Sequence, residues 1–227
     1  MADLSDRPVI IESAINGATR KERQKHTPRT TAEVTEDALA VIDAGASVLH
    51  NHPGDGEFEG PNGYGFYVES WKPLLAARPD AIIYPTAGSG PTIEEQYAHI
   101  PLLTKDAGLR VSYVDPGSVN LGGADAEGLP ADIPFVYANS YHNIRFKMRC
   151  CEELGLGPTI AVFEPGFLRV TLAYYRAGRM PRGAMVKFYF GGDRGYTSTP
   201  GAGSGVTFGL PPTKLSLEAY LAMYEGC

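Results

Sequence analysis

Short apolar runs alternate with longer amphipathic segments along the chain. The short runs have the length and β-branched composition of strands, and the longer segments repeat apolar residues every three or four positions, as helices do. The pattern predicts strands at residues 8–15, 46–52, 81–88, 110–120, 159–166 and 184–192. It predicts helices at residues 30–45, 67–79, 92–108, 143–157, 167–179 and 215–227.

Two of the predicted helices carry clear local signals. Thr30 and Glu33 have the spacing of a capping box, and Gly45 closes the helix that they begin. Pro101 interrupts the third predicted helix, because proline cannot donate a backbone hydrogen bond.

The alternation of strand and helix predicts an α/β fold. Each strand is apolar through most of its length, which is typical of a parallel sheet covered by helices. A doubly wound sheet and a (β/α)8 TIM barrel both fit, but no Gly-x-Gly-x-x-Gly follows the first strand and no Walker-type Gly-Lys-Ser/Thr occurs. The barrel is therefore favoured. Since a complete barrel takes roughly 250 residues, residues 1–227, with about six β/α units, are expected to form a single barrel domain that is incomplete at its C-terminus.

Polar residues collect where the predicted strands end. In both architectures ligands bind at the carboxyl ends of the strands. The candidate residues at these ends are Glu12, Asn16, His50, His52, Thr86, Asp115, Ser118, Asn120, Glu164, Gly191 and Gly192.

His50 and His52 form the most specific of these motifs. Residues i and i+2 of a strand point to the same side, so both imidazoles project together. Two histidines at a strand end suit a divalent metal such as zinc, which a carboxylate and a water usually complete. His-x-His also arises by coincidence, so a metal site and an ordinary loop both stay open from this spacing alone.

The remaining candidates each allow more than one role. Glu164 fits a metal ligand, a general base or a helix-capping acid, and Asp115 fits either a site residue or a turn former. The hydroxyl of Thr86 is suited to donating to a substrate oxygen or to capping the next helix. The Gly-rich residues 191–213 fit a mobile loop, a lid or a cradle for a phosphate-bearing cofactor.

The composition of the chain argues against some classes of binding partner. The net charge is −6 and the basic residues are scattered, which argues against binding to nucleic acid. The one basic run, residues 19–25, is either a solvated loop or a loop that attracts an anionic ligand. The apolar runs are too short to cross a membrane, and the N-terminus does not look like a secretory signal, so a cytoplasmic location is expected.

Several motifs in register resemble those of one enzyme family, the β-keto acid cleavage enzymes, relatives of 3-keto-5-aminohexanoate cleavage enzyme. The motifs are PVIIESAINGA, DALAVIDAGASVLHNH, RPDAIIYPTAG, DPGSVNLGG, FVYANS, IAVFEPGFLR, VKFYFGG and FGLPPT. The resemblance spans essentially the whole chain. It implies a (β/α)8 barrel that is usually a homo-oligomer, either a dimer or a tetramer.

The resemblance also implies a reaction. Zinc-dependent family members are acyltransferases that convert a β-keto acid and acetyl-CoA into acetoacetate and a new acyl-CoA. His50 and His52 match the two histidine ligands of the family, and Thr86 falls where the family has a hydroxyl facing the substrate. The chemistry requires no protein nucleophile, which agrees with the lack of a convincing Ser-His or Cys-His pair.

The chain departs from the family pattern in two respects. It has no last-strand motif of the type Val-Gly-Leu-Glu-Asp, which supplies the third zinc ligand and a base. Either the sequence is a fragment, or another residue such as Glu164 substitutes, or the chain is inactive. Thr19 replaces a glutamate suited to an ammonium group, and Tyr113 replaces a smaller threonine, so a neutral or differently shaped β-keto acid is the expected substrate.

Two other functions stay open. A metal-dependent barrel hydrolase also uses His-x-His, but commonly on the first strand. A truncated barrel that only binds metal or oligomerises is the non-catalytic alternative. The exposed edges of its first and sixth strands predict that such a chain aggregates or is completed by another chain.

Overall fold

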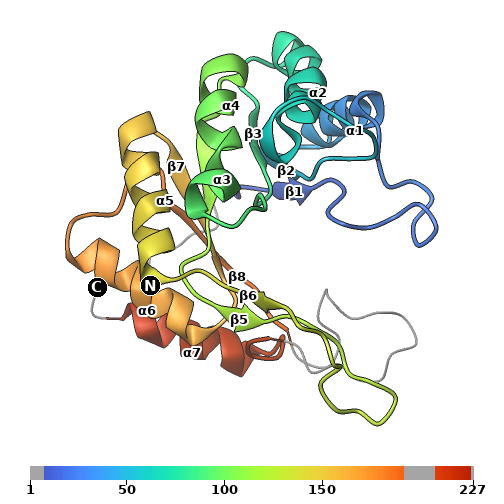
Figure 1. Ribbon diagram of the computed structural model, residues 1–227. Coiled ribbons are helices and arrows are strands. Elements are labelled where there is room, and N and C mark those ends of the chain that lie inside the picture. Colours follow the sequence, from blue (N-terminus) through green and yellow to red (C-terminus); the bar gives the residue numbers. More distant parts are fainter. Residues whose placement is uncertain (1–7, 192–207, 226–227) are drawn as a thin grey trace. The chain divides into compact units, whose positions relative to one another are not determined.

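A computed structural model describes residues 8–191 and 208–225, which divide into two units. The first unit extends to Ser112, and the second begins at Tyr113. Gly192 lies outside the described residues. Both units have the mixed α/β content that the alternating pattern predicts (Figure 1).

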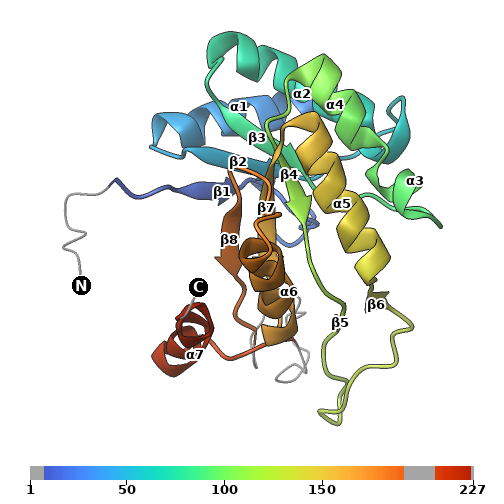
Figure 2. The ribbon, with the colours of Figure 1, turned by 90° about the vertical axis from the view of Figure 1, so that its left-hand side faces the viewer.

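The first unit is built on a three-stranded parallel sheet in the order β1-β2-β3. Helices α1, α2 and α4 lie on the same side of this sheet (Figures 1 and 2), and α2 packs against both α1 and α4. The elements in chain order are β1 (Glu12–Ala14), α1 (Thr31–Asp43), β2 (Val48–Asn51), the 3-10 turn η1 (Pro61–Gly63), α2 (Tyr64–Ala77), β3 (Ile82–Pro85), α3 (Ile93–Tyr97) and α4 (His99–Ala107).

The predicted first strand is shorter in the structure than in the sequence pattern. Only Glu12–Ala14 is a strand, and the preceding Val9 and Ile10 are 80% and 69% exposed. β1 pairs with β2 and lies at an edge of its sheet, so apolar residues before it have little surface to pack against.

Local signals explain how the helices begin and break. Thr30 and Glu33 form the expected capping box at the start of α1. The predicted helix over residues 92–108 is two helices, α3 and α4, separated at Ala98. Pro101 accounts for this break, since its ring clashes with the carbonyl four residues earlier, that of Tyr97.

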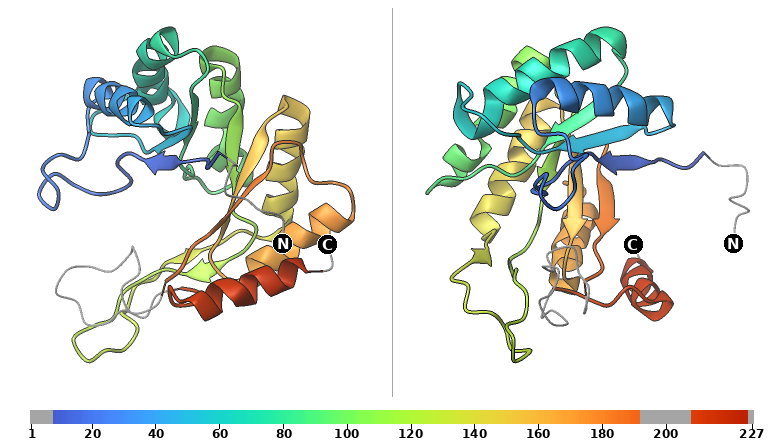
Figure 3. Two further views of the ribbon diagram at one scale, coloured as in Figure 1. Left: turned by 180° about the vertical axis from the view of Figure 1, so that it is seen from behind. Right: turned by 90° about the vertical axis from the view of Figure 1, so that its right-hand side faces the viewer.

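The second unit contains a sheet in the order β4-β7-β8, whose first strand, β4 (Val111–Val114), begins just before Tyr113. Helices α5 and α6 both pack against β7, and α7 packs against α6 (Figure 3). The other elements are β5 (Val119–Asn120), β6 (Val136–Tyr137), α5 (Tyr141–Leu154), β7 (Gly157–Val162), α6 (Pro165–Arg176), β8 (Met185–Phe188) and α7 (Lys214–Tyr224).

The prediction of a single strand over residues 110–120 is wrong. β4 ends at Val114, and Val119–Asn120 forms a separate strand that pairs antiparallel with Val136–Tyr137. Pro116 and Gly117 lie between the two strands, and both are turn-forming residues. Ser118 and Asn120 consequently lie at the base of an antiparallel hairpin rather than at the end of β4.

The described strands do not form a closed sheet. Residues 8–191 and 208–225 contain two three-stranded sheets and one two-stranded sheet. In this part of the chain, none of the helices has the length and apolar character needed to cross a membrane.

Candidate functional site

The two histidines of the HNH motif lie side by side at the end of β2. Their ring centroids are 5.1 Å apart and the rings meet edge to face. The His50 ring also stacks on Tyr84 of β3, and its Nδ1 hydrogen-bonds to the Tyr84 carbonyl over 3.3 Å. A hydrogen bond from the second ring nitrogen is the usual way in which proteins orient a metal-binding histidine.

Asn16 holds the backbone of His52. The His52 N–H donates to Asn16 Oδ1 over 2.8 Å, and Asn16 Nδ2 donates to the His52 and Pro28 carbonyls over 3.1 and 3.2 Å. Asn16 is buried, so these bonds are shielded from water. The structure therefore gives Asn16, a predicted substrate-binding residue, a role in positioning His52.

Glu12 joins the same cluster through Tyr84. The Tyr84 hydroxyl donates to the Glu12 carboxylate over 2.6 Å, while the Tyr84 ring stacks on His50. The parallel register explains this arrangement, because His50 lies opposite Ala14 on one side and Tyr84 on the other. Sequence reasoning missed Tyr84, which reads as one more apolar strand residue.

Thr86, directly after β3, has its backbone held from two sides. Its N–H donates to the Tyr67 hydroxyl over 3.2 Å, and its carbonyl accepts from His99 Nε2 over 3.1 Å. Tyr67 and His99 are fully buried. These contacts give the Thr86 side chain a rigid attachment, which a substrate-positioning residue requires.

Arg29 is a second residue of the first unit that sequence reasoning missed. Its guanidinium donates to Asp55 over 2.7 Å, and its positive charge disfavours protonation of His52. Burial, with a smaller contribution from Arg29, lowers the pKa of His52 to about 4.

Thr19, a predicted substrate-binding residue, lies in the turn after β1, where its N–H donates to the Asn16 carbonyl over 3.4 Å.

The histidine pair fits two positions of a zinc site. At neutral pH a histidine with a pKa of about 4 is uncharged, which is the form that binds metal. Catalytic zinc usually has three protein ligands. Among the described residues no group of three His, Cys, Asp or Glu side chains is arranged to hold a metal ion. Within the described part of the chain, His50 and His52 thus offer two imidazole groups suited to a metal ion.

A buried polar cluster occupies the end of β4 in the second unit. Asp115, a predicted site residue, is 9% exposed and accepts a hydrogen bond from the Tyr137 hydroxyl. Burial, reinforced by the Asp115 charge, raises the pKa of Tyr137 well above its ordinary value. Tyr113, also predicted, is buried two residues earlier on the strand.

Lys147 completes this cluster and was not expected from the sequence. Its side chain is 2% exposed, and its Nζ lies 4.8 Å from the Tyr113 ring centroid and 2.7 Å from Asn139 Oδ1. Burial lowers the pKa of Lys147, although the charge of Asp115 opposes the shift. A lysine in the middle of helix α5 reads as a solvent-facing residue in the sequence, which is why the pattern conceals it.

Ser118 fastens the base of the hairpin. Its hydroxyl donates to the Asn139 carbonyl over 3.2 Å and accepts from the Asn139 N–H over 2.9 Å. Ser118 also lines a pocket of about 420 Å³ with Glu164 and Tyr141. Asn120 is exposed and pairs with Val136 in the hairpin.

Glu164 precedes helix α6 at the N-cap position but does not cap it. Its carboxylate instead accepts from the Gly209 N–H over 2.7 Å. Gly191 donates its N–H to the Leu210 carbonyl over 3.0 Å, and a Cβ there would lie 1.7 Å from the Phe208 carbonyl oxygen. Both residues thus hold the segment after residue 207 against β7 and β8. Gly192, the other predicted cofactor-binding residue, lies outside the described residues.

Comparison with known proteins identifies related sequences over most of the chain. The sequence model described as beta-keto acid cleavage enzyme matches residues 8–209. A 3-keto-5-aminohexanoate cleavage enzyme of Acetoanaerobium sticklandii is 27% identical over 85% of this chain and 66% of that protein. The corresponding enzyme of Fusobacterium nucleatum is 26% identical over 81% of this chain and 63% of that protein.

A third relative carries a different activity in its name. The 3-dehydrocarnitine:acetyl-CoA trimethylamine transferase of Rhizobium meliloti is 26% identical over 72% of this chain and 58% of that protein. The chain thus spans less than two thirds of the length of the curated relatives that it matches here, close to two thirds in the first case.

Solved structures of ObcA share the fold. The apo structure superposes with a TM-score of 0.56 at 20% identity, covering 83% of this chain and 41% of that one. A ternary complex of ObcA with a C4-CoA adduct and oxalate gives a TM-score of 0.53 at 20% identity, covering 83% and 42%.

Proposed function

The chain belongs to the beta-keto acid cleavage enzyme family, and on that basis we propose that it takes part in cleaving a β-keto acid with acetyl-CoA. The products are acetoacetate and a new acyl-CoA. A base removes a proton from the carbon between keto and carboxylate groups, and the resulting carbanion attacks the thioester carbonyl and displaces the CoA thiolate. The thiolate then attacks the original ketone, the old carbon–carbon bond breaks, and the departing carbanion regains a proton.

The observation that supports this function most is the histidine pair at the end of β2. His50 and His52 lie side by side and are oriented by Tyr84 and Asn16, and they match the two histidine ligands that the family resemblance implies. They would hold a zinc ion. When bound, zinc supplies a Lewis acid for the keto oxygen and carboxylate of the substrate.

Thr86 is proposed to orient the substrate through its hydroxyl. Its backbone is clamped between the buried side chains of Tyr67 and His99, so the side chain is held in a limited range of positions. Positioning of this kind lowers the entropy lost when the reacting atoms are brought together. Glu164 is the other predicted catalytic residue. It is proposed to position the segment after residue 207, through its hydrogen bond with the Gly209 N–H, rather than to contact the substrate.

The substrate class is proposed to be a β-keto acid without an ammonium group. Thr19 stands in the turn after β1, where relatives that act on an amino-substituted acid would need a carboxylate. A threonine hydroxyl does not neutralise an ammonium ion. A (β/α)8 barrel is proposed as the fold type, since each unit contains parallel strands packed against helices.

The reaction is tested by incubating the purified chain with acetyl-CoA and a panel of β-keto acids. Formation of acetoacetate together with an equal amount of new acyl-CoA supports the proposal. Release of CoA thiol without a new thioester indicates a hydrolase instead. Absence of both products, in a chain that binds zinc and melts cooperatively, supports a non-catalytic metal-binding role.

Metal binding is tested separately by mass spectrometry of the protein. We expect about one zinc per chain in the wild type and loss of zinc in H50A/H52A. H142A is the matched control, because His142 is an exposed histidine on helix α5. Equal zinc content in all three proteins refutes the assignment of His50 and His52.

A further inference from the structure

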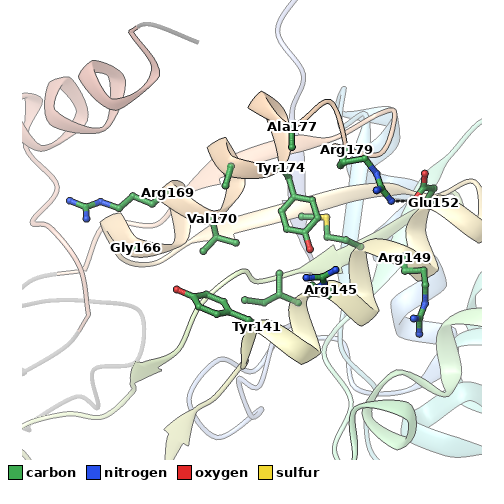
Figure 4. Close-up of a pocket in the computed structure, with 13 residues that line it drawn as sticks. Tyr141, Arg145, Arg149, Glu152, Gly166, Arg169, Val170, Tyr174, Ala177 and Arg179 are labelled. Atoms are coloured by element: carbon green, nitrogen blue, oxygen red, sulfur yellow. Dashed lines mark hydrogen bonds and ion pairs between the residues drawn. The ribbon is translucent and has the colours of Figure 1, made fainter.

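A long groove runs between helices α5 and α6 in the second unit. Its volume is about 860 Å³, and both helices contribute side chains along their length (Figure 4). Ile144 and Met148 of α5 are nearly fully buried beneath it, and Val170 of α6 is half-buried. The floor of the groove is therefore apolar.

Arginines surround this apolar floor. Four exposed arginines line the groove, namely Arg145, Arg149, Arg169 and Arg179. Glu152 is the one acidic residue among the groove-lining residues. Arg179 pairs with Glu152 over 3.5 Å. Within residues 8–191 and 208–225, no ion pair involves Arg145 or Arg169. A chain with a net charge of −6 thus presents a basic, apolar groove at this place.

The hydroxyl of Tyr174 lies among these charges. Burial raises the pKa of Tyr174, while the positive charges of Arg145 and Arg179 lower it. Figure 4 shows the Tyr174 ring and the Arg145 side chain directed toward the middle of the groove, while Tyr141 lies at one end of it. The groove consequently fits a partner that combines apolar side chains with carboxylates.

The hairpin of residues 119–137, here called the arm, has those two properties. It carries four exposed apolar side chains, namely Leu129 (61%), Ile133 (51%), Phe135 (51%) and Val136 (54%). It also carries Asp125, Glu127 and Asp132 and contains no lysine or arginine.

The arm is an ordered structure. β5 pairs with β6, Ala124 bridges Pro130, and the Asp125 carboxylate accepts from the N–H groups of Glu127 and Leu129 at the tip. Figures 1 and 2 show the arm projecting from the N-terminal end of α5, away from the length of that helix. Exposed apolar residues on a projecting, hydrogen-bonded hairpin are expected to mark a contact with another molecule.

We propose that the arm of one copy of this chain docks into the α5–α6 groove of a second copy. Phe135 and Ile133 would cover the apolar floor, and Glu127 and Asp132 would face the arginine rim. A two-fold arrangement makes the contact twice, since each copy offers one arm and one groove. The arm's net charge of −3, from its three acidic residues, complements the excess of arginine in the groove.

The proposal is independent of the catalytic function, and sedimentation velocity of the full chain tests it. The wild type should self-associate, and the association should weaken as salt is raised. F135S should raise the dissociation constant by about tenfold or more, as expected when a large apolar contact residue is truncated. Because Phe135 is half exposed, the melting temperature at low protein concentration should stay close to that of the wild type.

Charge reversal gives the sharper test. R145E/R169E makes the groove acidic and E127K/D132K makes the arm basic, so each variant alone should lose association. Mixed together, the two variants place every acidic arm against a basic groove and every basic arm against an acidic groove, and association should return. The control R176E, which reverses an exposed charge of α6 outside the groove, should behave like the wild type.

Three results would overturn the proposal. They are a wild type that sediments as a monomer at all concentrations, an oligomer that neither charge-reversed variant weakens, and a mixture of the two variants that fails to associate. A fold defect is separated from these results by circular dichroism, which should give the same spectrum for every variant.

Discussion

The folded first unit should lose stability when His99 becomes protonated. His99 is fully buried, and burial lowers its pKa from 6.5 to about 4. Its Nε2 lies 3.1 Å from the Thr86 carbonyl oxygen, which only accepts, so Nε2 carries the proton of the neutral ring.

The other ring nitrogen of His99 faces a donor. Its Nδ1 lies 3.5 Å from Asn62 Nδ2, and the orientation of this amide is fixed because Asn62 Oδ1 accepts the Ser89 N–H over 2.9 Å. A proton on Nδ1 would point at an N–H group of Asn62. The neutral imidazole is therefore the form that the fold accommodates.

The pKa values of His99 in the unfolded and folded chain determine the direction and the magnitude of the change in stability with pH. The unfolded chain binds a proton at His99 near pH 6.5 and the folded chain only near pH 4, so acid favours the unfolded state. Stability is fully present above about pH 6.5 and falls as the pH drops toward 4. At pH 5 the loss is about 2 kcal/mol, and the full shift corresponds to about 3.4 kcal/mol.

Urea unfolding at pH 8 and pH 5, followed by tryptophan fluorescence, measures this loss. Trp71 is the only tryptophan of the chain, and its ring centroid lies 5.0 Å from that of Tyr67, which in turn stacks on His99. The signal therefore reports on the unit that contains His99. The H99Q variant keeps a side-chain N–H donor but does not titrate, so its pH dependence should be smaller by about 2 kcal/mol.

The comparison between wild type and H99Q isolates His99, because His52 contributes equally to both. H142Q controls for the loss of a histidine from an exposed position. If wild type and H99Q lose the same free energy between pH 8 and pH 5, the reasoning is refuted.

Three further predictions concern stability and the loop beside the histidine pair. W71F removes the N–H that donates to Asn51 Oδ1 over 2.9 Å in the core, and should lower the free energy of unfolding by about 1–3 kcal/mol in urea titrations. T159V should stabilise the protein by about 1 kcal/mol, because the buried Thr159 hydroxyl has no hydrogen-bond partner among the described residues; a lower midpoint would contradict this. G54A should displace the loop after the histidine pair, because a Cβ there would lie 1.6 Å from the Arg29 carbonyl oxygen, and should weaken zinc binding measured by calorimetry.

Features encoded within a few residues could be predicted from the sequence. The capping box of Thr30 and Glu33 begins α1 as expected, and the alternation of apolar runs with amphipathic segments predicts the order of the principal strands and helices. The common side of His50 and His52 follows from the two-residue period of a strand. The family resemblance is confirmed by the match over residues 8–209.

Features that depend on residues far apart in the chain could not be predicted. Tyr84 and Glu12, which are 72 positions apart, meet because the strands pair in one particular register. Neither residue carries a local signal of that contact. Arg29 reads as a loop residue until the loop after β2 folds back to place Asp55 beside it.

In the second unit too, the sequence predicts local features, and the tertiary structure decides the contacts between distant residues. The helical period places Lys147 in α5, but the position of α5 against the sheet decides that its amine is buried beside Tyr113 and Asn139. The sequence pattern predicts one strand over residues 110–120, whereas the antiparallel pairing of β5 with β6 makes the residues after Pro116 and Gly117 a separate arm. The sequence by itself determined the order of most strands and helices, because backbone preferences are local, and its motifs determined the family. Tertiary structure decided which side chains meet, because burial and strand register bring together residues that are distant in the chain.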